Sequence, residues 1–415
     1  MNHAVRTAHS TCGSEPGLIS VDQALQMVLE HTDHLGTETL LLSQALNRFV
    51  AADIYSEIQL PIFSQSAVDG YAICMDADRP AESSFELIGE VRAGQGADVL
   101  LEPGQAVRIF TGAKIPLQTT TVARQEIVQL KDSTIILTQA LVLDADIRHA
   151  GEEISMGQCL AAQGQQLSIG TIAALSMAGI REIPVYRYPK IAVVITGDEV
   201  AETVEDLDSG KIFDANTPLI QALFQSRNQQ VEIMHVADTE QAVSDLFEQL
   251  RNQYDLILTT GGVSVGDYDF VRPVALKLGF EQLFWKVKQK PGKPMFFAKS
   301  DRPDQSPCYL LGLPGNPGAV YMGMQIYVST LINALQGQKQ LPQWFSAVMS
   351  HDLTADSRER FLRMVASFES GVLKISSLPK QQSHMLSNLM QANCIVRVPA
   401  AQAIRTGQIL QGLFI

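Results

Sequence analysis

The chain has 415 residues, 46% hydrophobic and 18% charged, which is the composition of a globular protein with two to four domains. Its formal net charge of −13, from 31 basic and 44 acidic residues, argues against nucleic acid or an anionic membrane surface as a partner. The cysteines have no paired spacing and residues 1–16 lack the apolar segment of a signal peptide, so we expect a cytoplasmic protein.

The first half of the chain combines helical and β-type patterns. Ser20 and Gln23 form a capping box, which predicts the start of a helix. Between residues 58 and 143, short β-prone runs alternate with Gly, Pro and Asp turns, which is typical of a small β domain. Helical signal returns at residues 169–177. We therefore predict a β domain (residues 58–144) inserted into a discontinuous, mainly helical N-terminal domain (residues 17–57 and 145–187).

The second half shows two further patterns. Apolar runs at residues 191–196, 231–236 and 256–260 alternate with helical segments, which favours a doubly wound parallel sheet over residues 188–338. After residue 339 the helical signal fades, and apolar alternation predicts a small, barrel-like C-terminal β domain (residues 339–415). The expected fold class is therefore multidomain α/β plus β.

Three polar or glycine-rich loops follow predicted strands of the sheet domain. They are TGDE (residues 196–199), GGVSVGD (residues 261–267) and LPGNP (residues 313–317). Each alone is consistent with a simple tight turn, but parallel strands would bring all three to the same edge of the sheet, where ligands bind. The segment between the last two, FWKVKQKPGKP (residues 284–294), holds four lysines without an acidic residue. Bare backbone N–H groups with nearby lysines suit a phosphate or another tetrahedral oxyanion.

Four carboxylates are also expected at this edge of the sheet. Asp198, Glu199, Asp267 and Asp269 follow the same strands and could hold Mg²⁺ or cap helix N-termini, and the pattern does not separate the two roles. In the β domain, SAVDGYA (residues 66–72), RIFTGAK (residues 108–114) and RQE (residues 124–126) fit either tight turns or a functional surface.

These motifs together resemble the molybdopterin molybdenumtransferases, the MoeA family that includes the E domain of gephyrin-like proteins. The segments that carry the resemblance run nearly end to end: SAVDGYA, RIFTGAKIP, RQE, RHAGEEI (residues 148–154), TGDE, TGGVSVGDYD (residues 260–269), KPGKP (residues 290–294), LPGNP and, more weakly, QSHMLS (residues 382–387). The order and spacing of TGGVSVGD, KPGKP and LPGNP are highly specific.

The resemblance implies a reaction and its partners. The protein would insert molybdate into the dithiolene of adenylylated molybdopterin, with Mg²⁺-dependent release of AMP. It would be a homodimer of four-domain subunits, with the discontinuous N-terminal domain serving as linker and dimerisation domain. Its sheet domain would be similar to the molybdopterin adenylyltransferase that supplies the substrate. Molybdoenzymes or their chaperones would receive the product.

The resemblance also assigns residues. Lys290 and Lys293 would hold molybdate or the terminal phosphate, and Arg363 and Ser383 would complete the oxyanion pocket, with Arg360 as the alternative arginine. The residues expected to bind the pterin phosphate are Gly261, Gly262, Ser264, Pro314, Gly315 and Asn316. Those expected to position the nucleotide and Mg²⁺ are Asp198, Glu199, Asp238, Asp267 and Asp269, of which Asp198, Glu199 and Asp269 would be metal ligands. Asp69 and Thr111 would reach the site of the partner subunit.

The chain departs from the family pattern at three places. Val68 replaces the usual Met, residues 317–319 read Pro-Gly-Ala in place of Pro-Val-Ser, and residues 381–384 read Gln-Gln-Ser-His. The change at Ala319 removes a hydroxyl next to the expected oxyanion. Two other functions stay open, a non-catalytic molybdopterin-binding scaffold and a hydrolase similar to nucleotide pyrophosphatases. Tungstate is an alternative oxyanion.

Overall fold

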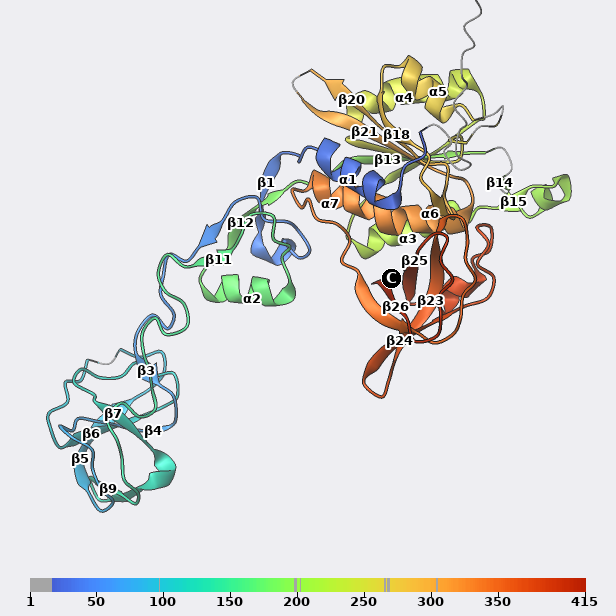
Figure 1. The fold of residues 1–415 in the computed structure, drawn as a ribbon. Coiled ribbons are helices and arrows are strands. Elements are labelled where there is room, and N and C mark those ends of the chain that lie inside the picture. Colours follow the sequence, from blue (N-terminus) through green and yellow to red (C-terminus); the bar gives the residue numbers. More distant parts are fainter. Residues whose placement is uncertain are drawn as a thin grey trace, which may run out of the picture. The chain divides into compact units, whose positions relative to one another are not determined.

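The computed structural model describes residues 17–96, 98–197, 200–201, 203–264, 266, 269–303 and 305–415 (Figure 1). The chain divides into two compact units. The smaller is Thr39–Pro184, and the larger combines Met1–Glu38 with Val185–Ile415. Within the described ranges, no helix combines the length and the apolar character that a membrane span requires.

The smaller unit contains a β domain and the segments that lead into and out of it. Six strands follow the order β7-β4-β6-β5-β9-β8: β4 Gly70–Ile73, β5 Ser84–Val91, β6 Gln105–Ile109, β7 Thr121–Arg124, β8 Val128–Lys131 and β9 Thr134–Leu137. Gly70 is required where β4 passes β7, because a Cβ there would lie 2.0 Å from the Ala123 carbonyl oxygen. The inserted β domain that the sequence predicts is therefore present as a hydrogen-bonded sheet.

Short paired segments join this β domain to the rest of the chain. They are β1 (Thr37–Leu41) with β12 (Glu182–Tyr186), β2 (Ile54–Tyr55) with β11 (Cys159–Ala161), and β3 (Gln65–Ser66) with β10 (Ile147–Arg148). A helix, α2 (Ile169–Met177), lies on the returning segment and begins at Ser168, whose hydroxyl accepts the Thr171 N–H. Short 3-10 turns occur at Leu42–Gln44 and Gln125–Ile127.

The larger unit is built on a six-stranded sheet with the order β16-β13-β17-β21-β20-β18. Its strands are β13 Ile191–Thr196, β16 Glu232–Val236, β17 Leu256–Thr260, β18 Glu281–Trp285, β20 Phe296–Arg302 and β21 Gln305–Leu313. The first four in the order are parallel, whereas β20 runs antiparallel to both of its neighbours. A small parallel pair, β14 (Val200–Ala201) with β15 (Ile212–Phe213), follows β13, with a 3-10 turn at Glu205–Ser209 between its strands.

Helices cover both faces of this sheet (Figure 1). On one face lie α4 (Glu240–Gln253) and α5 (Val271–Lys277), and on the other α1 (Val21–His31), α3 (Asn216–Ser226), α6 (Pro317–Gly323) and α7 (Ser329–Leu335). Alternate residues of β13 enter different cores, since Val193 packs with α1 and Val194 packs with α4. Burial on both faces explains why the parallel strands read as continuous apolar runs. The predicted doubly wound sheet is confirmed.

Helix α1 begins as its capping box predicts. The Ser20 hydroxyl accepts the Gln23 N–H at 3.1 Å, and the Gln23 side chain accepts the Ser20 N–H at 2.9 Å. Its buried side chains, including Leu25 and Val28, pack in the same core as α7 and the sheet. Helix α1 therefore belongs to the larger unit.

The C-terminal region forms a closed five-stranded barrel. Its strands are β22 Phe345–Met349, β23 Glu359–Glu369, β24 Val372–Ser377, β25 Cys394–Val398 and β26 Ile409–Phe414. The order β23-β24-β22-β26-β25 closes because β25 pairs back with β23. A short strand that precedes the barrel in sequence, β19 (Gln289–Lys290), pairs in parallel with β23. A 3-10 turn at Ser387–Met390 precedes β25. The expected barrel-like domain is confirmed, and its wall reaches the lysine-rich segment.

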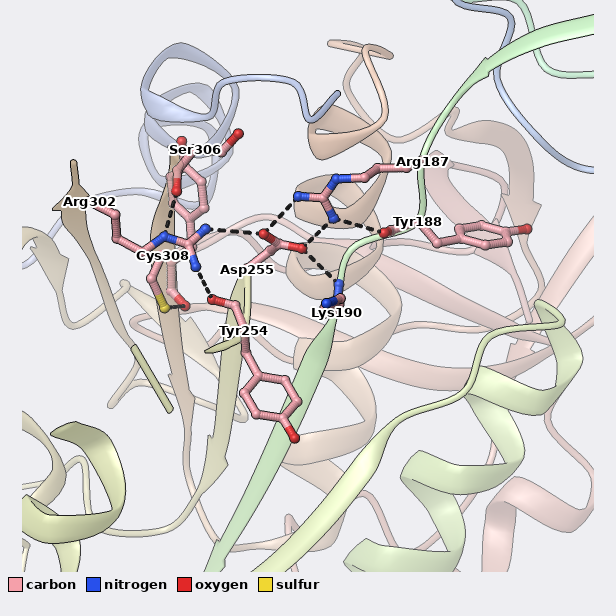
Figure 2. Close-up of polar contacts among 9 residues, drawn as sticks. Arg187, Tyr188, Lys190, Tyr254, Asp255, Arg302, Ser306 and Cys308 are labelled. Carbon is pink, nitrogen blue, oxygen red and sulfur yellow. Dashed lines mark hydrogen bonds and ion pairs between the residues drawn. The ribbon is translucent and has the colours of Figure 1, made fainter. Parts of the chain in front are cut away.

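A buried ion network holds the sheet at the end where β17 begins, away from the carboxyl ends of the parallel strands (Figure 2). Asp255 is 4% exposed, and its Oδ2 accepts Arg187 Nη1 at 2.6 Å and the Lys190 N–H at 2.9 Å. Its Oδ1 accepts Arg187 Nη2 at 2.9 Å and Arg302 Nη2 at 3.1 Å. Burial alone would raise the pKa of the Asp255 carboxyl, but the hydrogen bonds and charges of its partners bring that pKa below its usual value. Asp255 thereby ties β12–β13, β17 and β20 together.

Candidate active site

The carboxyl ends of the parallel strands lie at one edge of the sheet, as expected. Thr196 pairs with Val236, Ile195 with Thr260, and Thr260 with Leu313. The Gly261 N–H then donates to the Leu313 carbonyl at 2.9 Å, which joins the second and third predicted loops directly. The prediction that these loops share one edge is confirmed.

The turn after β17 depends on two glycines. Gly261 has φ +91° and Gly262 has φ +68°, both in the left-handed region that favours glycine. A Cβ at Gly261 would lie 2.5 Å from Thr196 Oγ1, and one at Gly262 would lie 2.6 Å from Val271 Cγ2. The Thr196 hydroxyl donates to the Thr260 carbonyl at 3.2 Å, so it cannot easily move away. The backbone of this turn is therefore closely packed and bare of side chains.

The rest of this loop is held from both sides. Val263 is buried in the core below it, and its carbonyl accepts the indole N–H of Trp285 at 3.0 Å. The Trp285 ring carries the guanidinium of Arg272 and the ammonium of Lys286, each 4.1 Å from its centroid. Ser264 is exposed beyond this anchor. Trp285 gave no signal in the sequence, because nothing in its neighbourhood pairs it with a loop so far away in the chain.

The LPGNP loop lies against the glycine turn. A Cβ at Gly315 would lie 3.6 Å from Gly261 Cα, and the Gly315 carbonyl accepts Asn216 Nδ2 at 2.9 Å. Pro314 is buried, whereas Gly315 and Asn316 are exposed. The Asn316 carbonyl accepts the N–H groups of Ala319 and Val320, so the loop leads directly into α6.

The lysine turn (residues 290–293) lies beside the start of α6. Gly292 has φ +87°, and a Cβ there would lie 3.9 Å from the Ala319 Cβ. The sequence suggested uncompensated lysines, but Lys290 Nζ is 2.9 Å from Asp356 Oδ2, a partner supplied by the C-terminal barrel. This hydrogen bond, more than any other contact, lowers the pKa of the Asp356 carboxyl. Lys293 is half-buried, and its carbonyl accepts the Val287 N–H at 2.9 Å.

A loop of the barrel covers the first turn of α6. The Ser383 carbonyl accepts the Gly318 N–H at 2.7 Å, and a Cβ at Gly318 would lie 2.7 Å from the same oxygen. Glycine at position 318 therefore admits this close approach. Arg363 is fully buried beneath the loop, and its guanidinium donates to the carbonyls of Lys380, Gln382 and Met385.

No carboxylate among the described residues pairs with Arg363, so it contributes an uncompensated positive charge under this loop. Burial lowers the pKa of Arg363. Arg360, the other candidate, pairs with Lys290 in the register of β23 with β19 and donates to the Thr354 carbonyl. The lysine turn, the start of α6, Arg363 and Ser383 thus come together at one place.

A cavity of about 580 Å³ opens at the ends of β13 and β16. Its lining is Gly197, Val200, Ala201, Lys211, Asp214, His235, Val236 and Ala237. Asp238 follows directly on this lining. Asp214 was not among the predicted residues, and its Oδ1 accepts the N–H groups of Asn216 and Thr217 at the start of α3. Its position just before a predicted helix is typical of a helix-capping residue and could have identified it.

The residues expected to bind Mg²⁺ are only partly described. Asp198, Glu199 and Asp267 lie outside the described residues, and in the part of the chain that is described no three His, Cys, Asp or Glu side chains form a cluster. Asp269 Oδ2 accepts the Gly266 N–H at 2.6 Å, and its other oxygen bonds to no described residue. A single carboxylate oxygen fits Mg²⁺, which commonly combines one or two carboxylates with ligand phosphates.

The β domain of the smaller unit presents its own polar group. Asp69 Oδ1 accepts both the N–H and the hydroxyl of Thr111, at 2.8 and 2.9 Å, and these bonds lower the pKa of Asp69. Arg108 lies over the rings of Tyr71 and Phe110, 5.0 and 5.2 Å from their centroids. Asp69 and Thr111 are therefore a preformed, exposed pair.

Models of known protein families match the chain in succession. The MoeA N-terminal region (domain I and II) matches residues 19–179, a probable molybdopterin binding domain matches residues 192–334, and the MoeA C-terminal region (domain IV) matches residues 346–413. These matches cover both units.

Similar proteins cover most of the chain as well. The molybdopterin molybdenumtransferase of Haemophilus influenzae is 36% identical over 91% of this chain and 94% of its own length. That of Staphylococcus epidermidis is 30% identical, over 94% of each chain. A solved structure, the molybdopterin biosynthesis MoeA protein of Pyrococcus horikoshii, has a TM-score of 0.81 at 24% identity and covers 96% of this chain and 100% of its own. At 24% identity this structural similarity shows the fold alone.

Proposed function

The chain belongs to the MoeA family of molybdopterin molybdenumtransferases, and we propose that it inserts molybdate into the dithiolene of adenylylated molybdopterin, with release of AMP. Its place is in molybdenum cofactor biosynthesis. The expected family membership is thereby confirmed.

The observation that carries the proposal is the meeting of cationic groups around the start of α6. Lys290 and Lys293 flank a tight turn, and the buried Arg363 lies under the loop that touches Gly318. Two ammonium groups and a guanidinium, of which the Lys290 ammonium is shared with Asp356, leave an excess of positive charge that can balance molybdate, a tetrahedral dianion. An acidic protein needs such a local site, because its overall field repels anions.

The nucleotide half of the substrate would occupy the cavity at the ends of β13 and β16. Lys211 there can face a phosphate, and the adjacent Asp238 is one of the carboxylates expected to position the nucleotide. Asp269 would hold Mg²⁺ together with the substrate's phosphates, and Asp198 and Glu199 are the further proposed ligands. Mg²⁺, when bound, would neutralise charge on the phosphoanhydride during hydrolysis. Asp267 completes the proposed set on the glycine loop.

A homodimer is part of the same proposal. Helix α2 is apolar almost throughout, yet of its residues only Leu175 is buried, while Ile169 is 78% exposed and Met177 is 49% exposed. An apolar helix left uncovered in one chain supports a partner surface. Asp69 and Thr111 would then act in the partner subunit's site. We further propose that the protein acts in the cytoplasm, between a molybdopterin adenylyltransferase and the molybdoenzymes or chaperones that receive the cofactor.

The test is AMP release from adenylylated molybdopterin and Mg²⁺, measured with and without molybdate. We expect molybdate-dependent release that falls at least tenfold in Lys293→Ala, because a charged hydrogen bond to a bound oxyanion is worth about 1.5–3 kcal/mol. Lys288→Ala, which removes an exposed lysine from the same segment, is the matched control and should keep full activity.

The alternatives predict other results. Release that ignores molybdate would identify a hydrolase, and tight binding without release would identify a scaffold. Repeating the assay with tungstate, and then with both oxyanions in competition, decides which one the site prefers.

A further inference from the structure

Two buried polar side chains lie beneath the lysine turn, and neither is among the site residues predicted from the sequence. Gln289 and Tyr327 are both fully buried. The Tyr327 hydroxyl donates to Gln289 Oε1 at 2.5 Å, and Gln289 Nε2 donates to the Gly292 carbonyl at 3.2 Å. A continuous chain of hydrogen bonds therefore runs from the helix that follows the LPGNP loop to the tip of the lysine turn.

Tyr327 lies in an irregular part of that helix. Residues Met324–Val328 form a π-helical turn between α6 and α7. The Ser329 hydroxyl donates to the Met324 carbonyl at 2.8 Å, and Arg227 Nη2 donates to the Ser329 hydroxyl at 2.6 Å. These two hydrogen bonds stabilise the π-helical turn. π-Turns inside α-helices often occur at functional sites. Burial raises the pKa of Tyr327 well above its usual value, so its hydroxyl is a donor throughout the physiological range.

Gln289 is also fixed from the other side. Arg358 Nη1 donates to the Gln289 carbonyl at 3.3 Å, and the register of β19 with β23 places Gln289 opposite Glu359. A Cβ at Gly292 would lie 2.9 Å from Gln289 Nε2, so the amide fills the inside of the turn. The oxygen and the nitrogen of the Gln289 amide are thus both hydrogen-bonded, and the amide occupies the space into which the turn would have to close.

We propose that Gln289 and Tyr327 are positioning residues that hold the lysine turn in its binding shape and thereby set the affinity for the oxyanion. This inference rests on the proposed function, in which Lys290 and Lys293 contact molybdate. A turn that is already ordered loses less conformational entropy on binding, so the pair acts on affinity and not on the chemical step. Neither side chain needs to touch the substrate.

The experiment compares Tyr327→Phe, Gln289→Met and the double variant. Each single change leaves a buried polar atom without its partner, whereas the double change removes both members of the pair. We expect the single variants to raise the half-saturating molybdate concentration about five- to tenfold at nearly constant kcat. The double variant should regain part of the lost thermal stability but keep the weak molybdate affinity, which a purely structural role would not produce.

Hydrogen exchange of residues 286–295 in the protein without ligand gives a second readout that does not depend on activity. It should become faster in all three variants. Tyr309→Phe is the matched control: Tyr309, in the middle of β21, is equally buried, and its hydroxyl accepts the Asp33 N–H at 2.8 Å. It should leave both exchange in this segment and molybdate affinity unchanged.

Unaltered exchange in Tyr327→Phe, or an equal effect of Tyr309→Phe, would overturn the inference. Faster exchange with unchanged molybdate affinity would overturn the claim that the order of the lysine turn sets the affinity for molybdate. If the wild-type protein instead releases AMP without any need for molybdate, the proposed function fails, and the exchange data alone then decide whether the pair holds the turn.

Discussion

Replacing Asp255 by Asn should destabilise the larger unit without touching the candidate active site. The substitution keeps the shape of the side chain but removes the charge that balances Arg187 and Arg302. It also places an amide donor where one carboxylate oxygen now accepts, so at least one guanidinium N–H loses its partner. Breaking a buried ion pair by removing one member costs about 3–5 kcal/mol. We expect about 3 kcal/mol, because Asn can still accept from one side.

Urea unfolding followed by tryptophan fluorescence measures this loss. Both tryptophans of the chain, Trp285 and Trp344, belong to the larger unit, so the signal reports that unit alone. With a slope of about 3 kcal/mol per M, a loss of about 3 kcal/mol lowers the urea midpoint by about 1 M. The control is Asp352→Asn, which removes an ion pair with Arg405 from a side chain that is 53% exposed.

The pH dependence of the stability difference between wild type and Asp255→Asn gives a second test. The pKa of Asp255 is lower in the folded protein than its usual value of 3.8, so its contribution is present above that value and is lost as the pH falls through the folded pKa. The difference between wild type and Asp255→Asn should therefore be constant near neutral pH and shrink below about pH 4. A midpoint shift no larger than that of Asp352→Asn, or a difference that grows in acid, would refute the reasoning.

Three further outcomes follow from the site and the core. Ala319→Ser returns a hydroxyl beside the lysine turn and should lower the half-saturating molybdate concentration about threefold in the AMP-release assay, since one hydrogen bond is worth about 0.5–1.5 kcal/mol; an unchanged or higher value would place the oxyanion elsewhere. Gly262→Ala, at φ +68° and against Val271, should lower the midpoint of urea unfolding by an amount equivalent to about 1–3 kcal/mol, and a wild-type midpoint would contradict the strain argument. Burial raises the pKa of the Cys308 thiol to about 12, so iodoacetamide at pH 8 should label the exposed Cys159 in the native protein well before Cys308, as read by peptide mass spectrometry; comparable rates would disprove that burial.

Local patterns predicted the elements that the structure confirms. The apolar runs that became β13 and β17 are buried on both faces, and that burial is what makes a parallel strand readable in sequence. The capping box at Ser20 predicted the start of α1 because both of its hydrogen bonds are local. The shared edge of the three loops followed from strand direction alone.

The contacts that shape the candidate site were not readable in the same way. Gln289 and Tyr327 are 38 positions apart and no spacing rule connects them. Lys290 lacks an acidic neighbour in sequence but meets Asp356 through the pairing of β19 with the barrel. Such long-range partners depend on how whole elements pack, so a single sequence leaves them open.

The approach of the barrel loop to α6 has an evolutionary consequence. Because a Cβ at Gly318 would meet the Ser383 carbonyl, a larger residue at position 318 requires the segment 380–385 to retreat. Arg363 donates to three carbonyls of that segment, so such a retreat would also pull on the arginine. Substitutions at position 318 should therefore arise together with changes in segment 380–385 among homologous chains, and a lineage that alters one without the other would have to rebuild the proposed oxyanion site.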